Sequence, residues 1–218
     1  MARSLKKLIA AVFCLVLLFE LSSCAVNTKS AEQTGFSMGS LVGIKLYGKN
    51  SEALENANLL AEVVKTDERI SKNYEGSDIY RVNSSGEHGE TVSSETYDEL
   101  RTVCDVYSDS HGKAAVLSGA LTELWGFDTD DFRLPSEDEI LSAKEKCGDD
   151  KLIFDDGKKV YIPDGAKLNL GSAGKGIALD EAVKRIDEIN SQGGKITGAV
   201  ISVGGSVATY GLPKKGKS

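Results

Sequence analysis

The sequence predicts an α+β domain in which strands and packed helices are mixed, and three observations support this fold class. Residues 40–47 alternate apolar and polar side chains, and residues 196–203 form an apolar run, as expected of strands near the two ends of the chain. Helical spacing of apolar residues dominates the segments between them. Residues 167–180 add a strand-like pattern, a glycine loop and a helical pattern, without the regular repeat of a doubly wound sheet.

The composition fits one globular domain, or one domain with an appendage. The chain has 218 residues, 40% of them hydrophobic, and only 3 prolines, which is enough apolar mass for a core. Its net charge of -7 argues against nucleic acid as a partner, because a phosphate backbone would be repelled. The basic cluster at residues 214–217 has no interleaved aromatic side chains, so we interpret it as a solvated tail.

Residues 1–23 have the pattern of a bacterial lipoprotein signal peptide. They begin with three basic residues and continue with an apolar run over residues 8–19, which is too short to span a membrane. The run closes with Leu21-Ser22-Ser23-Cys24, which resembles a lipobox. The resemblance implies that Cys24 carries fatty acyl chains such as palmitate. An ordinary secretory signal with an incidental cysteine is the alternative.

An acylated Cys24 would anchor the mature protein to the cell membrane on its extracytoplasmic face, since two acyl chains are enough for stable binding. Residues 24–34 are small and polar, as expected of a tether, which leaves residues 35–218 for the domain.

Two cysteines remain for the folded domain, Cys104 and Cys147, because Cys14 would leave with the signal. Their spacing suits no metal motif, and Cys104 falls on the apolar face of a helix. The sequence leaves open whether they form a disulfide or remain two thiols.

The first half of the domain begins with the strand pattern near residue 40. Ser51 opens an amphipathic helix in which Leu60, Val63, Val64, Asp67 and Ile70 follow helical spacing. Residues 71–85 are polar and rich in turn formers, so we expect a loop, of the kind that commonly carries binding residues.

A second helix is predicted from Tyr97 to Tyr107, with its end at residues 110–112. Ser136 and Glu139 form a capping box that predicts a third helix, extending to Cys147. The remaining signals are those of strands: a hairpin with its turn at Gly157, formed by residues 152–154 and 160–162, then strands over residues 196–203 and 207–210.

The glycine loop at residues 171–176 is the main candidate for a ligand site. Leu168 and Leu170 alternate like a short strand before it, and helical spacing resumes at Ile177. Glycines let a backbone approach a ligand, and free N–H groups at a helix start favour an anion such as phosphate. The alternative is a tight turn that only needs positive φ angles. The pattern argues against a Walker A loop, because the glycine spacing of that motif is longer and a hydroxyl residue follows its lysine.

Five segments together resemble the FAD:protein FMN transferase (ApbE) family, and they cover nearly all of the chain after the signal. Each motif alone is weak, but five in register are specific. The resemblance implies an ApbE, T-fold-like α+β fold. The motifs are Ser37-Met38-Gly39-Ser40, the spacing of Ser71, Tyr74, Ser77 and Asn83, Leu124-Trp125-Gly126-Phe127, Leu170 to Gly176 with Asp180, and Val203-Gly204-Gly205-Ser206.

The resemblance implies an enzyme that transfers the FMN part of FAD to a threonine or serine hydroxyl of a client protein, with Mg²⁺ as cofactor and AMP as the leaving group. The implied clients are flavoprotein subunits of membrane redox complexes. Phosphoryl transfer of this kind depends on positioning and on charge stabilisation by a metal ion, so a glycine loop beside a hard-metal site suits it.

The resemblance also implies roles for individual residues, although it names no catalytic group. Gly174 would offer its carbonyl oxygen to magnesium. Lys175 could contact a phosphate or be a solvated lysine. Met38, Tyr74 and Ile177 would lie near FAD, with Lys113, Ala114 and Ala115 in the flavin pocket.

This sequence departs from the family pattern in ways that reduce its expected activity. The aspartate and threonine that usually follow the glycine at position 112 are Ala115 and Leu117, and the usual aspartate at position 169 is an asparagine. The family's C-terminal portion, which supplies magnesium ligands, would follow Ser218. We therefore expect a C-terminally truncated member of the family.

Three functions are consistent with these observations. The first is the flavin transferase, and the second is a flavin-binding lipoprotein that performs no transfer because its metal ligands are missing. The third is a surface lipoprotein with a structural or adhesive role, which FAD would not stabilise.

Overall fold

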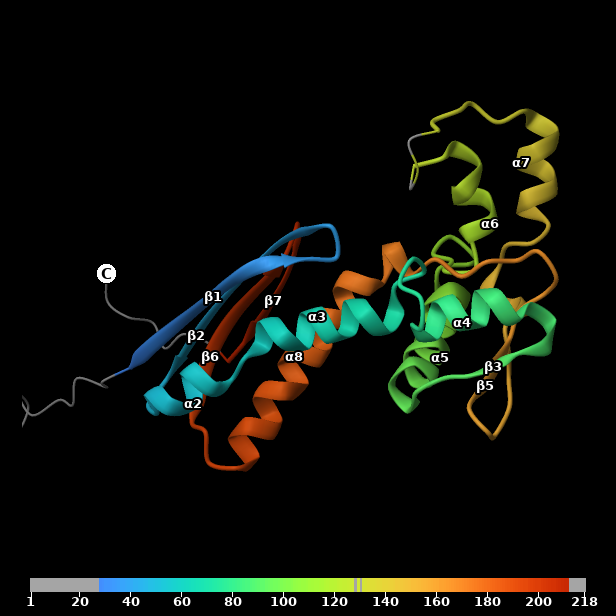
Figure 1. The fold of residues 1–218 in the computed structure, drawn as a ribbon. Coiled ribbons are helices and arrows are strands. Elements are labelled where there is room, and N and C mark those ends of the chain that lie inside the picture. Colours follow the sequence, from blue (N-terminus) through green and yellow to red (C-terminus); the bar gives the residue numbers. More distant parts are fainter. Residues whose placement is uncertain (1–27, 128, 130, 212–218) are drawn as a thin grey trace, which may run out of the picture.

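The computed structural model describes residues 28–127, 129 and 131–211. The predicted signal peptide, Cys24 and the basic cluster at residues 214–217 lie outside this range. Figure 1 shows two lobes, one built on a sheet and one built mainly of helices, with helix α8 running from one toward the other. Among the described residues, no helix is both long enough and apolar enough to cross a membrane.

The sheet lobe contains four antiparallel strands in the order β1-β2-β6-β7. Strand β1 pairs with β2 around a turn at Met38 and Gly39, and β6 pairs with β7 around a turn at Gly204 and Gly205. Because Val42 pairs with Val203, both turns lie at the same end of the sheet. The strands are β1 (Lys29–Ser37), β2 (Ser40–Gly48), β6 (Ile196–Val203) and β7 (Ser206–Tyr210).

Three helices cover one face of this sheet and form the first core with it: α2 (Ser51–Asn56), α3 (Leu59–Ile70) and α8 (Gly174–Ser191). Leu46 and Ile201 from the strands and Ile186 from α8 are fully buried. Each such side chain contributes about 1.5–3 kcal/mol on burial. Apolar burial on one face therefore holds this lobe together.

The second lobe packs two helices against a small sheet of order β3-β5-β4. Its core includes Ile79, Leu100, Val160 and Leu168, all with no exposed surface. Its elements are α4 (Asp78–Ser85), η1 (Gly86–His88), β3 (Glu90–Thr91), α5 (Ser94–Asp109), η3 (Asp149–Lys151), β4 (Ile153–Phe154), β5 (Lys159–Tyr161) and η4 (Leu170–Ser172).

An arm over residues 118–147 projects from the second lobe (Figure 1). It carries α6 (Gly119–Thr122), the short 3-10 helix η2 (Glu123–Trp125) and α7 (Glu137–Lys144). The capping box predicted for Ser136 and Glu139 is present at the start of α7. The helix ends at Lys144, three residues before the predicted end.

The α+β class is confirmed, and so are the second helix within α5, the hairpin β4–β5 and the strands β6 and β7. Cys104 and Cys147 are both free thiols, and Cys104 packs against the second core. Burial raises the pKa of Cys104 to about 11, so this thiol stays protonated at neutral pH.

Three predictions about local structure were wrong. The helix over residues 51–70 is two helices, because Asn58 adopts a left-handed φ of 44° between them. The expected loop 71–85 contains α4, whose first turn is capped by the Ser77 hydroxyl. The tether predicted over residues 24–34 cannot include residues 29–34, because these pair with β2 as part of β1.

Candidate functional site

Residues 167–169 run through the second lobe in an extended conformation but have no strand partner. The Asn83 side chain takes that place: its Nδ2 donates to the Leu168 carbonyl oxygen (2.9 Å) and its Oδ1 accepts from the Leu168 N–H (2.7 Å). One amide group thus supplies both hydrogen bonds that a neighbouring strand would make. The predicted strand at this point is wrong as regular structure, although Leu168 and Leu170 are buried as its alternation requires.

The other side of this extended stretch contacts the segment that contains the predicted flavin pocket. The Asn169 N–H donates to the Val116 carbonyl oxygen, and the Gly119 N–H donates to the Lys167 carbonyl oxygen, both at 2.8 Å. The stretch therefore joins two motif segments that are about fifty to eighty residues away along the sequence.

The three glycines of the loop do not serve as left-handed turn residues. Positive φ angles occur at several glycines, but not at Gly171, Gly174 or Gly176, so the tight-turn interpretation is wrong. Gly174 is buried, and a Cβ atom there would lie 3.3 Å from the Ile70 Cδ1 atom. Close packing therefore explains why a glycine occupies this position. Gly176 is exposed, with nothing within 4 Å of a Cβ position. Open surface therefore remains beside the first turn of α8.

Lys175, between these glycines, meets both hairpin turns of the sheet lobe. A Cβ atom on Gly204 would lie 2.9 Å from the Ser40 Oγ atom and 3.1 Å from the Lys175 Nζ atom. Gly204 also has a φ of 59° and donates its N–H to the Leu41 carbonyl oxygen (2.9 Å), so a glycine is required here by conformation and by space. The M-G-S turn, the G-G turn and the start of α8 thus converge on one point.

Met38 occupies the turn between β1 and β2 and packs against both cores. Its φ of 52° is unusual for a residue with a side chain. Asp67 holds this turn, because its Oδ2 atom accepts hydrogen bonds from the Met38 N–H (2.6 Å) and the Ser37 hydroxyl (2.9 Å). The sequence signal for this role is the place of Asp67, a carboxylate among the apolar positions of its helix.

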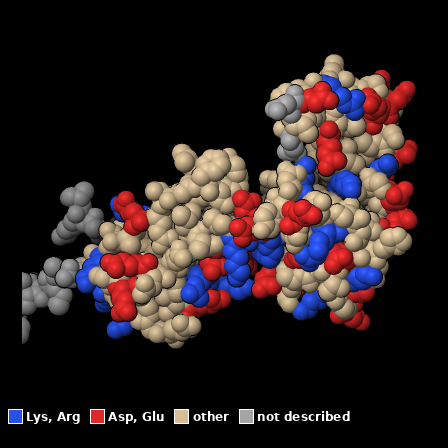
Figure 2. Space-filling model, in the orientation of Figure 1, with Lys and Arg blue, Asp and Glu red and all other residues tan. Residues whose placement is uncertain are grey.

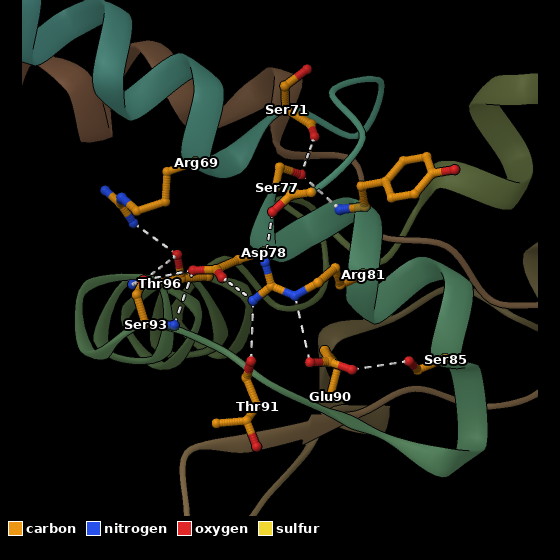
Figure 3. Close-up of polar contacts among 12 residues, drawn as sticks. Arg69, Ser71, Ser77, Asp78, Arg81, Ser85, Glu90, Thr91, Ser93 and Thr96 are labelled. Carbon is orange, nitrogen blue, oxygen red and sulfur yellow. Dashed lines mark hydrogen bonds and ion pairs between the residues drawn. The ribbon is translucent and has the colours of Figure 1, made fainter.

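The loop that carries Tyr74 is held by the residues drawn in Figure 3. The Ser77 hydroxyl donates to the Ser71 carbonyl oxygen (2.5 Å) and accepts from the Tyr80 N–H, while the Ser77 N–H donates to the Tyr74 carbonyl oxygen (2.9 Å). The Tyr74 side chain is 52% exposed and free of core packing. Its loop is thus fixed while its ring faces solvent.

Asp78, at the start of α4, ties this loop to the beginning of α5 (Figure 3). Its Oδ2 atom accepts from the Ser93 N–H (3.0 Å) and hydroxyl (2.6 Å), and its Oδ1 atom pairs with Arg81 (2.6 Å). Burial raises the pKa of Asp78, but the hydrogen bonds from Ser93, Thr96 and Arg81 outweigh burial and hold this pKa below its ordinary value.

Residues 113–115 follow the end of α5, where His111 and Gly112 both have positive φ angles. The Ser110 hydroxyl oxygen accepts the N–H groups of Lys113 (3.2 Å) and Ala114 (3.0 Å). Lys113 and Ala114 are exposed, and Ala115 is half-buried. The segment is therefore an ordered surface loop beside the extended stretch.

Ile177 packs partly against the second core and lines a groove of about 340 Å³ between α5 and α8. The groove carries five carboxylates, on Glu95, Asp98, Glu99, Asp180 and Glu181. These would repel a phosphate. A role for Ile177 at FAD stays a prediction. The roles of Met38, Tyr74 and residues 113–115 at FAD also stay predictions.

The role of Gly174 as a magnesium ligand stays a prediction. Within the described ranges, no group of three or more His, Cys, Asp or Glu side chains could hold a metal ion. The charged side chain next to Gly174 in the chain is Lys175, a cation. Because hard cations are held by several oxygen ligands, one carbonyl oxygen does not make a magnesium site.

The charge around the site is mixed. Figure 2 shows lysine, arginine and acidic side chains interleaved where the two lobes meet, and acidic side chains gathered on the arm. Arg69, near the end of α3, forms a bidentate pair with Glu99 at 2.5 and 2.6 Å. Lys72 lies 3.6 Å from Glu123 of η2, so the Tyr74 loop adjoins the segment that contains Trp125.

Known proteins resemble this chain in sequence and in fold. A model described as the ApbE family matches residues 38–218. The chain is 22% identical to the FAD:protein FMN transferase of Haemophilus influenzae over 225 residues, covering 98% of this chain and 64% of that protein.

Solved structures with the same fold include the ApbE protein of Thermotoga maritima, with a TM-score of 0.74 and 26% identity over 83% of this chain and 59% of that one. The flavinyl transferase ApbE of Pseudomonas stutzeri, in its apo form, gives a TM-score of 0.72 and 24% identity over 84% of this chain and 58% of that one. The chain thus spans between 58% and 64% of the length of these relatives.

Proposed function

This chain belongs to the ApbE family, and from that premise we propose that it binds FAD and transfers the FMN part to a threonine or serine hydroxyl of a client protein. The hydroxyl oxygen bonds to the phosphorus atom of FMN while the bond between that phosphorus and the bridging oxygen breaks. AMP leaves with the bridging oxygen, and the hydroxyl proton passes to solvent.

The observation that carries this proposal is the convergence of two glycine turns on the start of α8. The Ser40 Oγ and Lys175 Nζ atoms lie 2.9 and 3.1 Å from the position that a Cβ atom on Gly204 would take, and Gly176 leaves the first turn of the helix open. No side chain of a described residue caps the α8 N-terminus, so the N–H groups of its first turn, at the positive end of the helix dipole, are not taken by a capping side chain. A pyrophosphate needs such donors and a cation, and here they come from three separate segments.

The proposal includes client flavoproteins of membrane redox complexes and a lipid anchor at Cys24 on the extracytoplasmic face. Both rest on the sequence resemblances. Magnesium dependence also rests on the resemblance, and since the described residues do not form a metal site, we assign no step of the transfer to the ion. What these residues do is bind the dinucleotide and orient its phosphates.

The test uses the full chain with FAD, Mg²⁺ and a flavoprotein client that carries the acceptor hydroxyl. The expected result is a client whose mass increases by bound FMN, together with released AMP in equal amount. A parallel reaction with a chelator measures the metal requirement. If neither flavinylated client nor AMP is formed after saturation with FAD, the transferase function is contradicted.

The flavin-binding lipoprotein without transfer is the second candidate. It is favoured by the apolar Ala115 and Leu117 at normally polar positions and by the missing metal-ligand cluster among the described side chains. It predicts that FAD binds and quenches Trp125 fluorescence while no AMP appears. If FAD leaves the melting temperature unchanged, neither candidate holds.

A further inference from the structure

Asp149 is a buried carboxylate placed directly behind the loop of the predicted flavin pocket. It is 2% exposed and begins η3, after Gly148 with a φ of 115°. Its Oδ1 atom accepts the N–H groups of Val116 (2.9 Å) and Leu117 (2.6 Å), and its Oδ2 atom also accepts from Val116 (3.0 Å). The Gly148 N–H donates a hydrogen bond to the Leu117 carbonyl oxygen (3.1 Å). Two chain segments about thirty residues apart are thus clamped together.

Burial raises the pKa of Asp149 above its ordinary value, and the backbone N–H groups of Leu117 and Val116 offset this effect only in part. No ion pair in the described part of the chain involves this residue, and Asp150 beside it is also acidic. Leaving a carboxylate buried is costly unless its oxygens accept hydrogen bonds. The two N–H groups are therefore held firmly, since losing them would leave the charge uncompensated.

These bonds leave one backbone donor of the loop available. The N–H groups of Lys113 and Ala114 are taken by Ser110, and those of Val116 and Leu117 by Asp149. Between them, the Ala115 N–H has no hydrogen-bond partner within residues 28–127, 129 and 131–211. A donor fixed on both sides is suited to a carbonyl oxygen or ring nitrogen of a flat heteroaromatic ligand.

We propose that Asp149 is a positioning residue for the binding loop, which holds the Ala115 N–H in place as a donor to the flavin ring. This rests on the proposed function. It also gives a physical reason why the loop tolerates an alanine at position 115: Asp149 holds the backbone on one side of this residue, where the Val116 and Leu117 side chains are buried in the second core.

The test compares Asp149→Asn with a matched control, Asp155→Asn. Asp155 also accepts two backbone N–H groups, from Gly157 and Lys159 at 2.9 Å, but in the hairpin β4–β5. Affinity for FAD is measured by flavin fluorescence on the full chain, at a temperature where both variants are folded. Loop order is measured as the rate of trypsin cleavage after the exposed Lys113.

The expected result is that Asp149→Asn weakens FAD binding about tenfold or more and accelerates cleavage after Lys113, because one acceptor becomes a donor facing the Val116 N–H. Asp155→Asn lowers the melting temperature but leaves affinity and cleavage unchanged. Equal affinity loss in both variants, or wild-type affinity in Asp149→Asn, overturns the proposal.

The experiment distinguishes failure of the proposed function from failure of the positioning role of Asp149. If the wild type binds no FAD, the flavin role of Ala115 falls with the proposed function. Faster cleavage after Lys113 in Asp149→Asn alone would then still support Asp149 as the anchor of this loop, and unchanged cleavage would overturn that role too.

Discussion

The two lobes are stabilised in different ways. The sheet lobe relies on backbone ladders and one apolar core, in which Leu46 and Ile201 have no exposed surface. The second lobe contains most of the buried polar groups, including Ser77, Asp78 and Asp149, and each of them bonds a backbone group of a loop. The comparison teaches that the sheet supplies rigidity, while buried side chains of the second lobe give its loops a shape.

The largest effect is expected from truncating the sheet core. Leu46→Ala removes a fully buried side chain between strands and helices and should lower the free energy of unfolding by about 2–5 kcal/mol. Chemical denaturation followed by circular dichroism measures it. Val200→Ala on the exposed face of the same sheet is the control and should change stability little. Similar losses in both variants would contradict a one-sided core.

The second lobe is best probed at Asp78, with an expected loss of about 2–3 kcal/mol for Asp78→Ala, because the Ser93 donors and Arg81 lose their buried partner. The pKa of this carboxyl is lowered by folding, so its stabilising effect is present above the unfolded pKa and is lost as pH falls through the folded pKa. The difference between the free energies of unfolding at pH 7 and at pH 3 should therefore be smaller in Asp78→Ala than in the wild type. An unchanged pH dependence would show that other carboxyls dominate.

Where the lobes meet, Lys175→Met should weaken FAD binding about tenfold while leaving the melting temperature unchanged, since the ammonium group makes no ion pair with a described residue. Lys184→Met, on the same helix and 3.6 Å from Glu181, is the matched control and should bind FAD normally. Calorimetric titration with FAD measures the affinity of both variants. Equal binding by both variants would remove the phosphate role of Lys175.

The smallest effect is expected in the arm. Ser136→Ala removes the cap of α7 and should cost about 0.5–2 kcal/mol, seen as faster amide exchange in the arm alone. Hydrogen bonds from the Ser136 N–H and from Arg133 lower the pKa of Glu139 to about 2, so the capping box should persist as pH falls to about that value. Protection lost already near pH 4 would contradict this.

The sequence predicted best what depends on periodicity. The alternation after Ser40 and the apolar run at residues 196–203 became β2 and β6, because the buried face of a sheet imposes that pattern. Prediction failed where the partner is a side chain distant in sequence. Residues 167–169 have a strand pattern, but Asn83 takes the place of a strand, and no local rule could reveal that.

The same limit applies to the candidate site. The motifs located its glycine turns, but not Asp67 and Asp149, the carboxylates that hold two of its loops. Asp67 could have been suspected from its place on an apolar helix face. Asp149 gave no such signal, because the N–H groups that donate to it, those of Val116 and Leu117, come close only in the folded chain.

The hold on the extended stretch depends on the chemical state of one side chain, the Asn83 amide. Deamidation would convert the donating Nδ2 group into a second oxygen and place a negative charge against the Leu168 carbonyl oxygen, with almost no change in shape. Stored protein should then lose ligand binding in proportion to aspartate at position 83, as peptide mapping can measure. Hydrolysis of the Asn83 side-chain amide alone would thus remove a hydrogen bond that holds residues 167–169 in place.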